Sequence, residues 1–474
     1  MREIITLQFG AHANYVGMHF WNMARRQAEA RRSDAESRQV LFGEQTQGGA
    51  DLFRPRALVF DQADGFGSLG HADMQSTGDD ERDQEDALWG GATEVHRQLP
   101  HSQPEPEQPL RDRRMRFWSD YRQVAFDSRS LATVSGVEFG NSLGEMTTFD
   151  EGARVFAGSD ARGDVLEDGF RIYAEACDQV QGFQALADAS GGFAGYAASF
   201  IERVRDEYPK SPVLLYSVDA ASTRDIAARD GRQAVDIAVA TVAALENASV
   251  AVSLFVPSRV RGPFSGVVPG DLFGTSGMLA MNVAQWMQPL VEGSRMMDEV
   301  VALVTQQSYL RVAESMLAPA LQGVSAGLSA ADIIDSRFTA CSDVVLAGGL
   351  RNLGGGFAVD RGTAFGDVLA DRLFEPARWH SIEGAAMLPT TFPRILRDVG
   401  PDGFLSATNV PDPVDQVCVA GLLCTAGGTS EHLQRLHSTL SAEASKYLKD
   451  YERDTIRGLR YVLDAEIDKY AEIG

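Results

Sequence analysis

A glycine-rich loop followed directly by a helix is the feature that most constrains how this chain can fold. The loop is Ser190–Gly195, and a helical pattern runs from it to Pro209, which cannot continue a helix. We expect a polar helix before the loop, ending in Gln181–Gln184 and followed by a short apolar turn. Glycines before a helix can bring backbone N–H groups and the positive end of the helix dipole onto a phosphate. The alternative is a tight turn between packed helices, and the glycines alone do not separate the two.

The opening residues have the order of a second ligand loop. Ile4–Phe9 is rich in β-forming residues and ends at Gly10, and a helical pattern follows to about Ala30. Strand, glycine turn and helix open a doubly wound α/β sheet, in which ligands bind at the carboxyl ends of the strands. Further strands are predicted at Arg54–Asp61, Val213–Val218 and Val250–Val256, which favours a parallel sheet.

Composition divides the first part of the chain. We expect an N-terminal domain over residues 1–268, interrupted at about 69–114 by an acidic insertion rich in Pro, Glu and Gln. Such a segment cannot build an apolar core, so it is predicted to be disordered. Aromatic residues at 117–121 mark the return to order, and we interpret them as core anchors.

The second part is predicted to hold an α+β domain and a helical hairpin. Residues 269–428 begin with a long helix from Gly270, continue with a helix over 297–318, and then alternate loops and strands. Residues 429–474 are almost entirely helical in pattern, with an apolar seam and charged outer faces. The predicted fold class is therefore α/β, with a doubly wound domain, a second α+β domain and two closing helices.

Charge and cysteine content exclude several classes of function. The 474 residues are 44% hydrophobic and carry a formal net charge of −23, so the chain is globular and repels nucleic acid. Four scattered cysteines provide neither a disulfide framework nor a zinc spacing. The first residues do not resemble a signal peptide, and no apolar run is long enough to span a membrane. We expect a soluble chain with peripheral membrane association left open.

Common catalytic motifs are absent from the sequence. There is no G-x-x-x-x-G-K-[ST] phosphate loop, no H-E-x-x-H and no G-x-S-x-G, and the eight histidines lack metal spacing. The loop at 190–195 is thus the one candidate for ligand chemistry.

Several separated segments resemble tubulin, in the same order along the chain. They are Met1–Ile4 with Gln8, Gly10, Asn14, Gly17 and Phe20–Trp21; Pro55–Ala57 with Asp61; Cys177–Asp178 with Gln181–Gln184; Arg205–Pro209; and, more weakly, Glu246–Asn247 and Gly270–Leu272. The insertion at 69–114, the Phe117–Asp120 motif after it and the incomplete glycine signature are foreign to tubulin. This combination is similar to the Misato family of eukaryotic proteins.

The resemblance implies a tubulin/FtsZ-like fold with a vestigial nucleotide site. The matching residues are Gly10, Ala11, His12, Asn14, Gly191, Gly192, Phe193 and Gly195. Phe193 stands where tubulin has a threonine and is expected to fill phosphate space, while a lone His12 is also typical of a polar turn. Each hydrogen bond lost to a charged ligand costs about 1.5–3 kcal/mol. GTP is the one cofactor that the resemblance offers, and these changes predict that it does not bind tightly.

Other departures affect magnesium binding, base recognition and hydrolysis. Tubulin's magnesium-associated glutamate falls on Ala63, and its base-reading asparagines fall on Pro257–Ser258 and Phe273. The stretch Leu290–Arg295 lacks the family's Asn-Ala-Asp pattern, which supplies an acid to the next subunit for hydrolysis. We therefore predict no catalytic residues and no metal site.

The Misato resemblance implies a role in mitochondrial distribution, morphology and inheritance, with links to tubulin biogenesis through cytosolic chaperones. Our leading hypothesis is a non-enzymatic regulator that is cytoplasmic and associated with mitochondria. Its expected partners are proteins: tubulin, the cytosolic chaperonin or proteins of the mitochondrial outer surface. Two alternatives stay open, a divergent GTPase that still polymerises and a tubulin-folding adaptor that works with the chaperonin.

Overall fold

The computed structural model describes eighteen stretches of the chain, which include most of the first 305 residues outside the insertion. The described residues are 2–30, 35–47, 50–62, 65–67, 69, 115–134, 146–160, 169–223, 230–256, 264, 266–268, 270–305, 309–319, 339–340, 380–396, 415–424, 429–448 and 453–471. Residues 70–114 of the expected insertion lie outside this set, as do Ala63 and Pro257–Ser258. The boundaries expected at 268 and 428 stay predictions.

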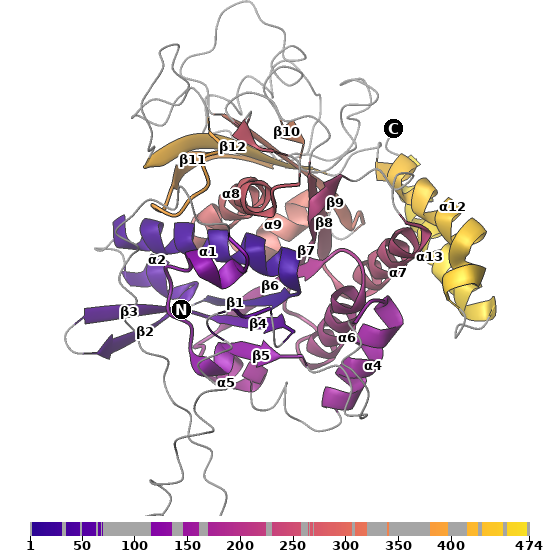
Figure 1. Cartoon of the computed structure of the whole chain (residues 1–474), viewed down its shortest axis with the longest axis horizontal. Coiled ribbons are helices and arrows are strands. Elements are labelled where there is room, and N and C mark those ends of the chain that lie inside the picture. Colours follow the sequence, from indigo (N-terminus) through magenta and orange to yellow (C-terminus); the bar gives the residue numbers. More distant parts are fainter. Residues whose placement is uncertain are drawn as a thin grey trace, which may run out of the picture.

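A mixed sheet of ten strands organises the described residues (Figure 1). Seven strands run parallel in the order β5-β4-β1-β6-β7-β8-β9, and β12 and β11 extend the sheet antiparallel from β9, which also pairs with β10. The strands are β1 (Glu3–Phe9), β4 (Ala57–Asp61), β5 (Leu131–Thr133), β6 (Val180–Asp188), β7 (Val213–Thr223), β8 (Val250–Val256), β9 (Val312–Pro319), β10 (Thr339–Ala340), β11 (His380–Met387) and β12 (Gln416–Cys424). A separate hairpin joins β2 (Phe42–Gln47) to β3 (Ala50–Pro55).

Helices cover both faces of the parallel strands, as a doubly wound sheet requires. Successive side chains of β1 alternate between the faces: Ile4 packs in the cluster of α1 and α8, whereas Ile5 and Leu7 pack with α6. The helices are α1 (Ala11–Ala30), α2 (Ala35–Gln39), α4 (Phe149–Asp160), α5 (Arg171–Glu175), α6 (Gly192–Glu207), α7 (Gly231–Asn247), α8 (Leu272–Val291), α9 (Met297–Val304), α12 (Thr429–Tyr447) and α13 (Arg453–Ala471). Two short 3-10 helices are η3 (Trp118–Tyr121) and η4 (Ser128–Ser130).

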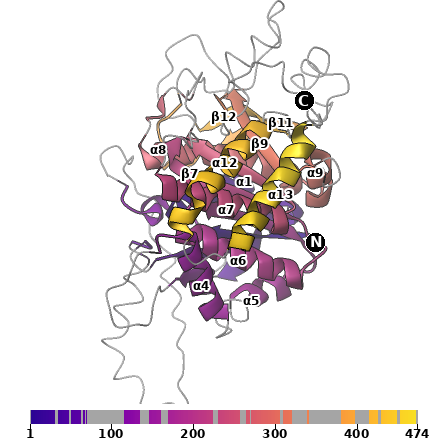
Figure 2. The same ribbon diagram turned by 90° about the vertical axis from the view of Figure 1, so that its right-hand side faces the viewer.

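The two closing helices pack against the outer side of α7 (Figure 2), and Tyr470 of α13 also hydrogen-bonds to the backbone of Val312 in β9. Their apolar seam, which includes Leu436 and Leu440 of α12 and Leu463 of α13, packs in one cluster with Val235 and Val239 of α7. The two closing helices of the predicted fold class are present as α12 and α13, whereas the domain bounds 429–474 stay a prediction. No helix among the described ranges has the length and apolarity needed to cross a membrane.

Two helices expected from the sequence are wrong. Residues 180–188 form β6, which lies between β1 and β7 in the sheet, and not the end of a helix and a turn. Both faces of β6 are buried, with Phe183 and Ala185 toward α6 and Leu186 toward α1 and α8, so no polar alternation reveals the strand. The helix expected over 297–318 ends at Val304, and β9 begins at Val312.

Candidate functional site

Four residues mark the edge of the sheet at which a doubly wound fold binds its ligands. Gly10 follows β1, and Asp61, Asp188 and Asp219 lie at or near the carboxyl ends of β4, β6 and β7. Gly10 has φ +93°, and a Cβ atom there would collide with the Asp188 carboxylate. Glycine is therefore required at position 10 both by its backbone conformation and by the neighbouring carboxylate.

An internal carboxylate occupies the N-terminus of α1. Asp188 Oδ1 accepts a hydrogen bond from the backbone N–H of Ala13 at 2.8 Å. The first N–H groups of a helix and its dipole attract anions, so this is where a phosphate would be expected. The pKa of Asp188 is raised to about 7, mainly because burial penalises the charged carboxylate; Asp61 and Asp219 add to the rise, whereas His12 and the Ala13 N–H oppose it.

His12 and Asn14, two of the residues predicted for the nucleotide site, make contacts within the chain. His12 Nδ1 lies 3.3 Å from Oδ1 of the buried Asp219. The buried Asn14 amide donates to the Phe60 carbonyl at 3.0 Å and to Asp61 Oδ2 at 2.9 Å. Ala11, which contributes no polar side chain, is exposed at the start of α1. These contacts tie α1 to the strand ends.

The N–H groups of the glycine loop are also used within the chain. The Gly191 N–H donates to Asp236 Oδ2 at 3.2 Å, and the Gly192 N–H donates to the Met146 carbonyl at 3.1 Å. Asp236, on α7, also accepts the Phe149 N–H through its other oxygen at 3.4 Å. Burial raises the pKa of Asp236 to about 6, which the two N–H donors partly offset. The loop therefore bonds to α7 and to the start of α4.

Close helix packing explains why the loop is rich in glycine. A Cβ atom at Gly192 would collide with Met146, and one at Gly195 would collide with the Phe149 carbonyl. On the opposite side, a Cβ atom at Gly152 of α4 would collide with the Gly192 carbonyl. The backbones of α4 and α6 thus approach as closely as glycines allow. This geometry matches the alternative reading of the loop as a tight turn between packed elements.

Phe193, which follows Gly192 in α6, is buried. Its side chain is 8% exposed and belongs to the apolar cluster that contains Phe9 and Tyr196. A Cβ atom at Gly10 would lie 2.9 Å from Phe193 Cβ, so the first loop and the glycine loop pack directly on each other. The structure thus brings the two predicted loops together, as the resemblance implied, and places apolar atoms between them.

Aromatic residues fill the space between α1 and the start of α8. The Trp118 indole N–H donates to Asp61 Oδ2 at 2.8 Å, and the Tyr121 hydroxyl donates to the Tyr15 carbonyl at 2.8 Å. The Tyr121 ring stacks on His19 at 4.3 Å and meets Phe273 edge-on at 4.9 Å. Trp118 and Tyr121 are each 1% exposed, which confirms that this segment is a core anchor.

Sequence reasoning missed the acidic residues of this edge. Asp188, Asp219 and Asp236 were not singled out, although the first two come late in their apolar strands. Recognition of β6 as a strand would have placed Asp188 beside Gly10, since parallel strands end at one edge. Within the described residues, no group of three or more His, Cys, Asp or Glu side chains could hold a metal ion.

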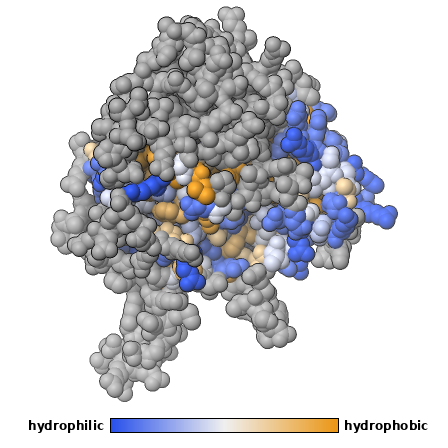
Figure 3. All heavy atoms as spheres, turned by 45° about the horizontal axis from the view of Figure 1, so that its top comes forward, coloured by the Kyte–Doolittle hydropathy of each residue, from blue (hydrophilic) through white to orange (hydrophobic). Residues whose placement is uncertain are grey.

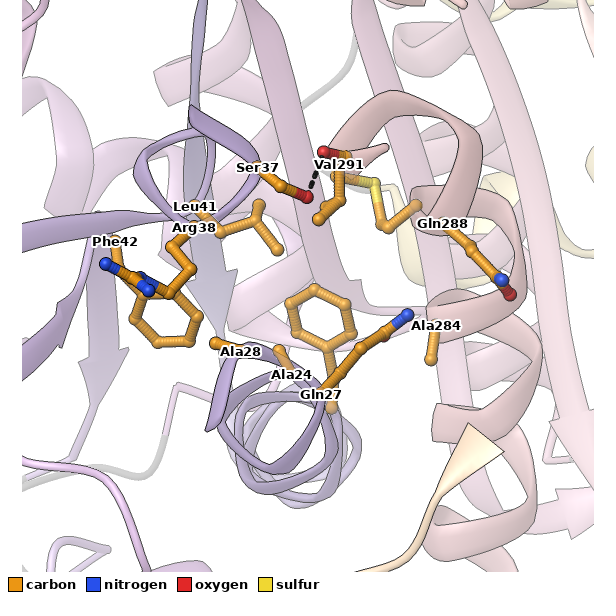
Figure 4. A pocket seen from close by; sticks show the side chains of 12 residues that line it. Ala24, Gln27, Ala28, Ser37, Arg38, Leu41, Phe42, Ala284, Gln288 and Val291 are labelled. Atoms are coloured by element: carbon orange, nitrogen blue, oxygen red, sulfur yellow. Dashed lines mark hydrogen bonds between the residues drawn. The ribbon is translucent and has the colours of Figure 1, made fainter. Parts of the chain in front are cut away.

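A groove of about 460 Å³ lies away from this edge, between α1, α2 and the end of α8 (Figure 4). Ser37 Oγ closes one side by donating to the Val291 carbonyl at 2.6 Å, and Gln27 extends toward Ala284. A second space, of about 600 Å³, lies between the sheet and helices α6, α7 and α12, and alanines form much of its wall. Asp188 also borders this second space.

Two family models match consecutive parts of the chain. A Misato segment II tubulin-like domain matches residues 2–112, and a tubulin domain matches residues 107–287. Residues 2–287 of this chain thus carry a Misato segment II domain and a tubulin domain. Its seven parallel strands flanked by helices accord with a tubulin-like fold.

Curated proteins of fungi and of the mouse are similar to about half of this chain. The chain is 31% identical over 237 residues to Protein DML1 of Gibberella zeae, which covers 46% of each chain. It is 30% identical over 236 residues to Protein dml1 of Aspergillus clavatus, which covers 47% of each. Protein misato homolog 1 of Mus musculus is 28% identical over 248 residues, 46% of this chain and 44% of its own. The chain spans about half the length of the curated relatives it matches.

Proposed function

We propose that this Misato-family chain is a non-enzymatic regulator of mitochondrial distribution, morphology and inheritance, which acts through protein partners from the cytoplasmic side of mitochondria. The mitochondrial role rests on the family resemblance. The non-enzymatic character rests on the site at the carboxyl edge of the sheet. A tubulin-like fold is compatible with GTP hydrolysis, so the argument depends on the residues of that site.

The use of the loop's own N–H groups is the observation that carries the proposal. Gly191 and Gly192 donate to Asp236 and Met146, and Asp188 accepts the Ala13 N–H at the start of α1. A triphosphate would have to displace these contacts and approach three carboxylates, which repel it. Phe193 supports the same conclusion, because its side chain is buried and its Cβ atom packs against Gly10 of the first loop.

Protein partners require an accessible surface, and the closing helices provide one. The outer faces of α12 and α13 are hydrophilic (Figure 3) and carry exposed charges such as Glu431 and Arg435. Tyr461 of α13 is 74% exposed within this charged face. An exposed tyrosine among charged residues is typical of a protein interface. We infer that tubulin, the cytosolic chaperonin or a mitochondrial outer-surface protein binds here.

The test combines nucleotide binding with cellular rescue. Purified chain is titrated with fluorescent GTP in the presence of magnesium, and binding at micromolar affinity or tighter would contradict the closed site. In parallel, depleted cells are complemented with the wild-type chain, with Tyr461→Ala or with Glu202→Ala, a control on the exposed face of α6. We expect fragmented or misplaced mitochondria with Tyr461→Ala only.

Co-purification separates the regulator from the folding adaptor. If the wild-type chain recovers chaperonin subunits or tubulin but never mitochondria, the adaptor function replaces our proposal. If it recovers mitochondria and Tyr461→Ala does not, the regulator function is supported.

A further inference from the structure

The segment Phe117–Gln123 contacts α1 and the end of β4 as a bound peptide would. Its hydrogen bonds come from side chains as well as from the backbone. They are Trp118 Nε1 to Asp61 Oδ2 at 2.8 Å, Ser119 Oγ to the Phe66 carbonyl at 2.9 Å, Tyr121 Oη to the Tyr15 carbonyl at 2.8 Å, Asn22 Nδ2 to the Tyr121 carbonyl at 2.8 Å, the Gln123 N–H to Asn22 Oδ1 at 2.9 Å, and the Arg25 guanidinium to the Gln123 carbonyl.

Asn22 recognises the backbone of this segment. Its amide donates to the Tyr121 carbonyl and accepts the N–H of Gln123, two residues further along. Paired donor and acceptor contacts of this kind replace the contacts that a neighbouring strand would make, and they do not depend on side-chain identity. Asn22 is fully buried, so its amide is committed to this contact.

Two groups of neighbouring residues enclose aromatic side chains of the segment. One holds the Trp118 ring, which meets Phe66 edge-on at 5.6 Å while its N–H reaches Asp61. The other holds the Tyr121 ring between His19 and Phe273, with its hydroxyl on the Tyr15 carbonyl. Aromatic anchors in buried pockets, each with a polar tip satisfied, are the features that dominate peptide affinity.

We propose that the crevice between α1, the start of α8 and the end of β4 is a peptide-binding site, which this chain fills in cis with Phe117–Gln123. The ligand class is a short peptide with tryptophan and, three residues later, tyrosine. A partner protein with such a segment competes with the chain's own residues for the site. This inference does not depend on the mitochondrial role, because it concerns only which chemistry the crevice recognises.

The test empties the site and offers the peptide in trans. Trp118→Ala/Tyr121→Ala is made in the full chain, and a fluorescein-labelled peptide of residues 115–126 is titrated by anisotropy. We expect the peptide to bind the double variant saturably, with an affinity at least about tenfold higher than for the wild type. In the wild type, the chain's own segment competes for the site at high effective concentration. Adding Asn22→Ala to the double variant should weaken binding at least about tenfold. A peptide with alanine in place of both aromatics should not bind.

The proposal is overturned if the folded double variant does not take the peptide, or if wild type and double variant bind it equally. Circular dichroism and gel filtration establish folding beforehand. If the double variant does not fold, the single variant Tyr121→Phe is used, which keeps the ring and loses only the hydroxyl contact. Peptide should then raise the melting temperature of Tyr121→Phe more than that of the wild type, and equal shifts count against the site.

Discussion

The carboxylate of Asp188 caps the first turn of α1 by accepting the Ala13 N–H at 2.8 Å. The same carboxylate leaves no room for a side chain at Gly10. An anion supplied by the chain thus holds the position that a phosphate takes in nucleotide-binding relatives of this topology. Because burial, together with two neighbouring carboxylates, raises the pKa of Asp188, this carboxyl group makes stability depend on pH.

Asp188→Asn should stabilise the protein more at pH 8 than at pH 5. The pKa of Asp188 is about 7 in the folded protein, above its ordinary value, so the folded state binds the proton more tightly than the unfolded state. Wild-type stability therefore falls as pH rises toward 7, and asparagine, which keeps an acceptor for Ala13, removes that fall. We expect Asp188→Asn to increase the free energy of unfolding by about 1–3 kcal/mol more at pH 8 than at pH 5, after allowance for solvent screening.

Urea denaturation at both pH values measures this difference, with Asp206→Asn on the exposed face of α6 as the control. An equal effect of Asp188→Asn at pH 5 and pH 8 would show that the carboxylate is not destabilised by folding.

Asp236→Ala should destabilise the protein by about 2–4 kcal/mol, because it leaves the buried Phe149 N–H and the half-buried Gly191 N–H without their acceptor. Hydrogen exchange should accelerate at these two amides in particular. Asp236→Asn retains one acceptor oxygen and should therefore lose less stability than Asp236→Ala. The difference should be largest above pH 6, because the pKa of the wild-type carboxyl is about 6 and burial penalises its charged form. Unchanged exchange at Gly191 in Asp236→Ala would contradict the assigned contact.

Gly195→Ala should destabilise the chain by about 1–3 kcal/mol, although alanine is the better helix former. The added methyl group would collide with the Phe149 carbonyl, which forces α4 away from α6. Gly458→Ala in α13 is the matched control, because nothing lies within 4 Å of a Cβ atom there. It should stabilise by about 0.5–1 kcal/mol. Thermal unfolding of the two variants should therefore shift in opposite directions, and shifts of the same sign would refute the close packing.

Phe193→Thr should not create tight GTP binding, even though it restores the hydroxyl that tubulin has at this position. The remaining obstacles, Asp188 at α1 and the bonded N–H groups of Gly191 and Gly192, are unchanged. Loss of the buried ring should cost about 2–4 kcal/mol of stability. Fluorescent GTP titration is the readout, and a large gain in affinity would show that the phenyl ring alone blocks the site.

The sequence located the first loop and the helices that follow both loops, but α6 begins at Gly192, inside the loop expected over Ser190–Gly195. The sequence also could not show which role the glycines have. The glycine pattern at Gly191, Gly192 and Gly195 is equally compatible with a phosphate-binding loop and with a close helix–helix contact. Both structures need a stretch of backbone that carries no side chains. The partners that distinguish the two, Met146 and Asp236, lie 45 residues or so from the loop in opposite directions, and no local signal links them to it.

Local patterning by itself determined the strands and helices with clear boundaries, the α/β class, the closing hairpin and the aromatic anchor at 117–121, because apolar periodicity and glycine or proline stops are properties of neighbouring residues. Only the tertiary structure decided that 180–188 is a strand, since burial on both faces removes the alternation that would identify it. Tertiary contacts also decided the chemistry of the edge. Parallel strands bring together Asp61, Asp188 and Asp219 from three separate parts of the chain, and this convergence fills the ligand edge with the chain's own groups.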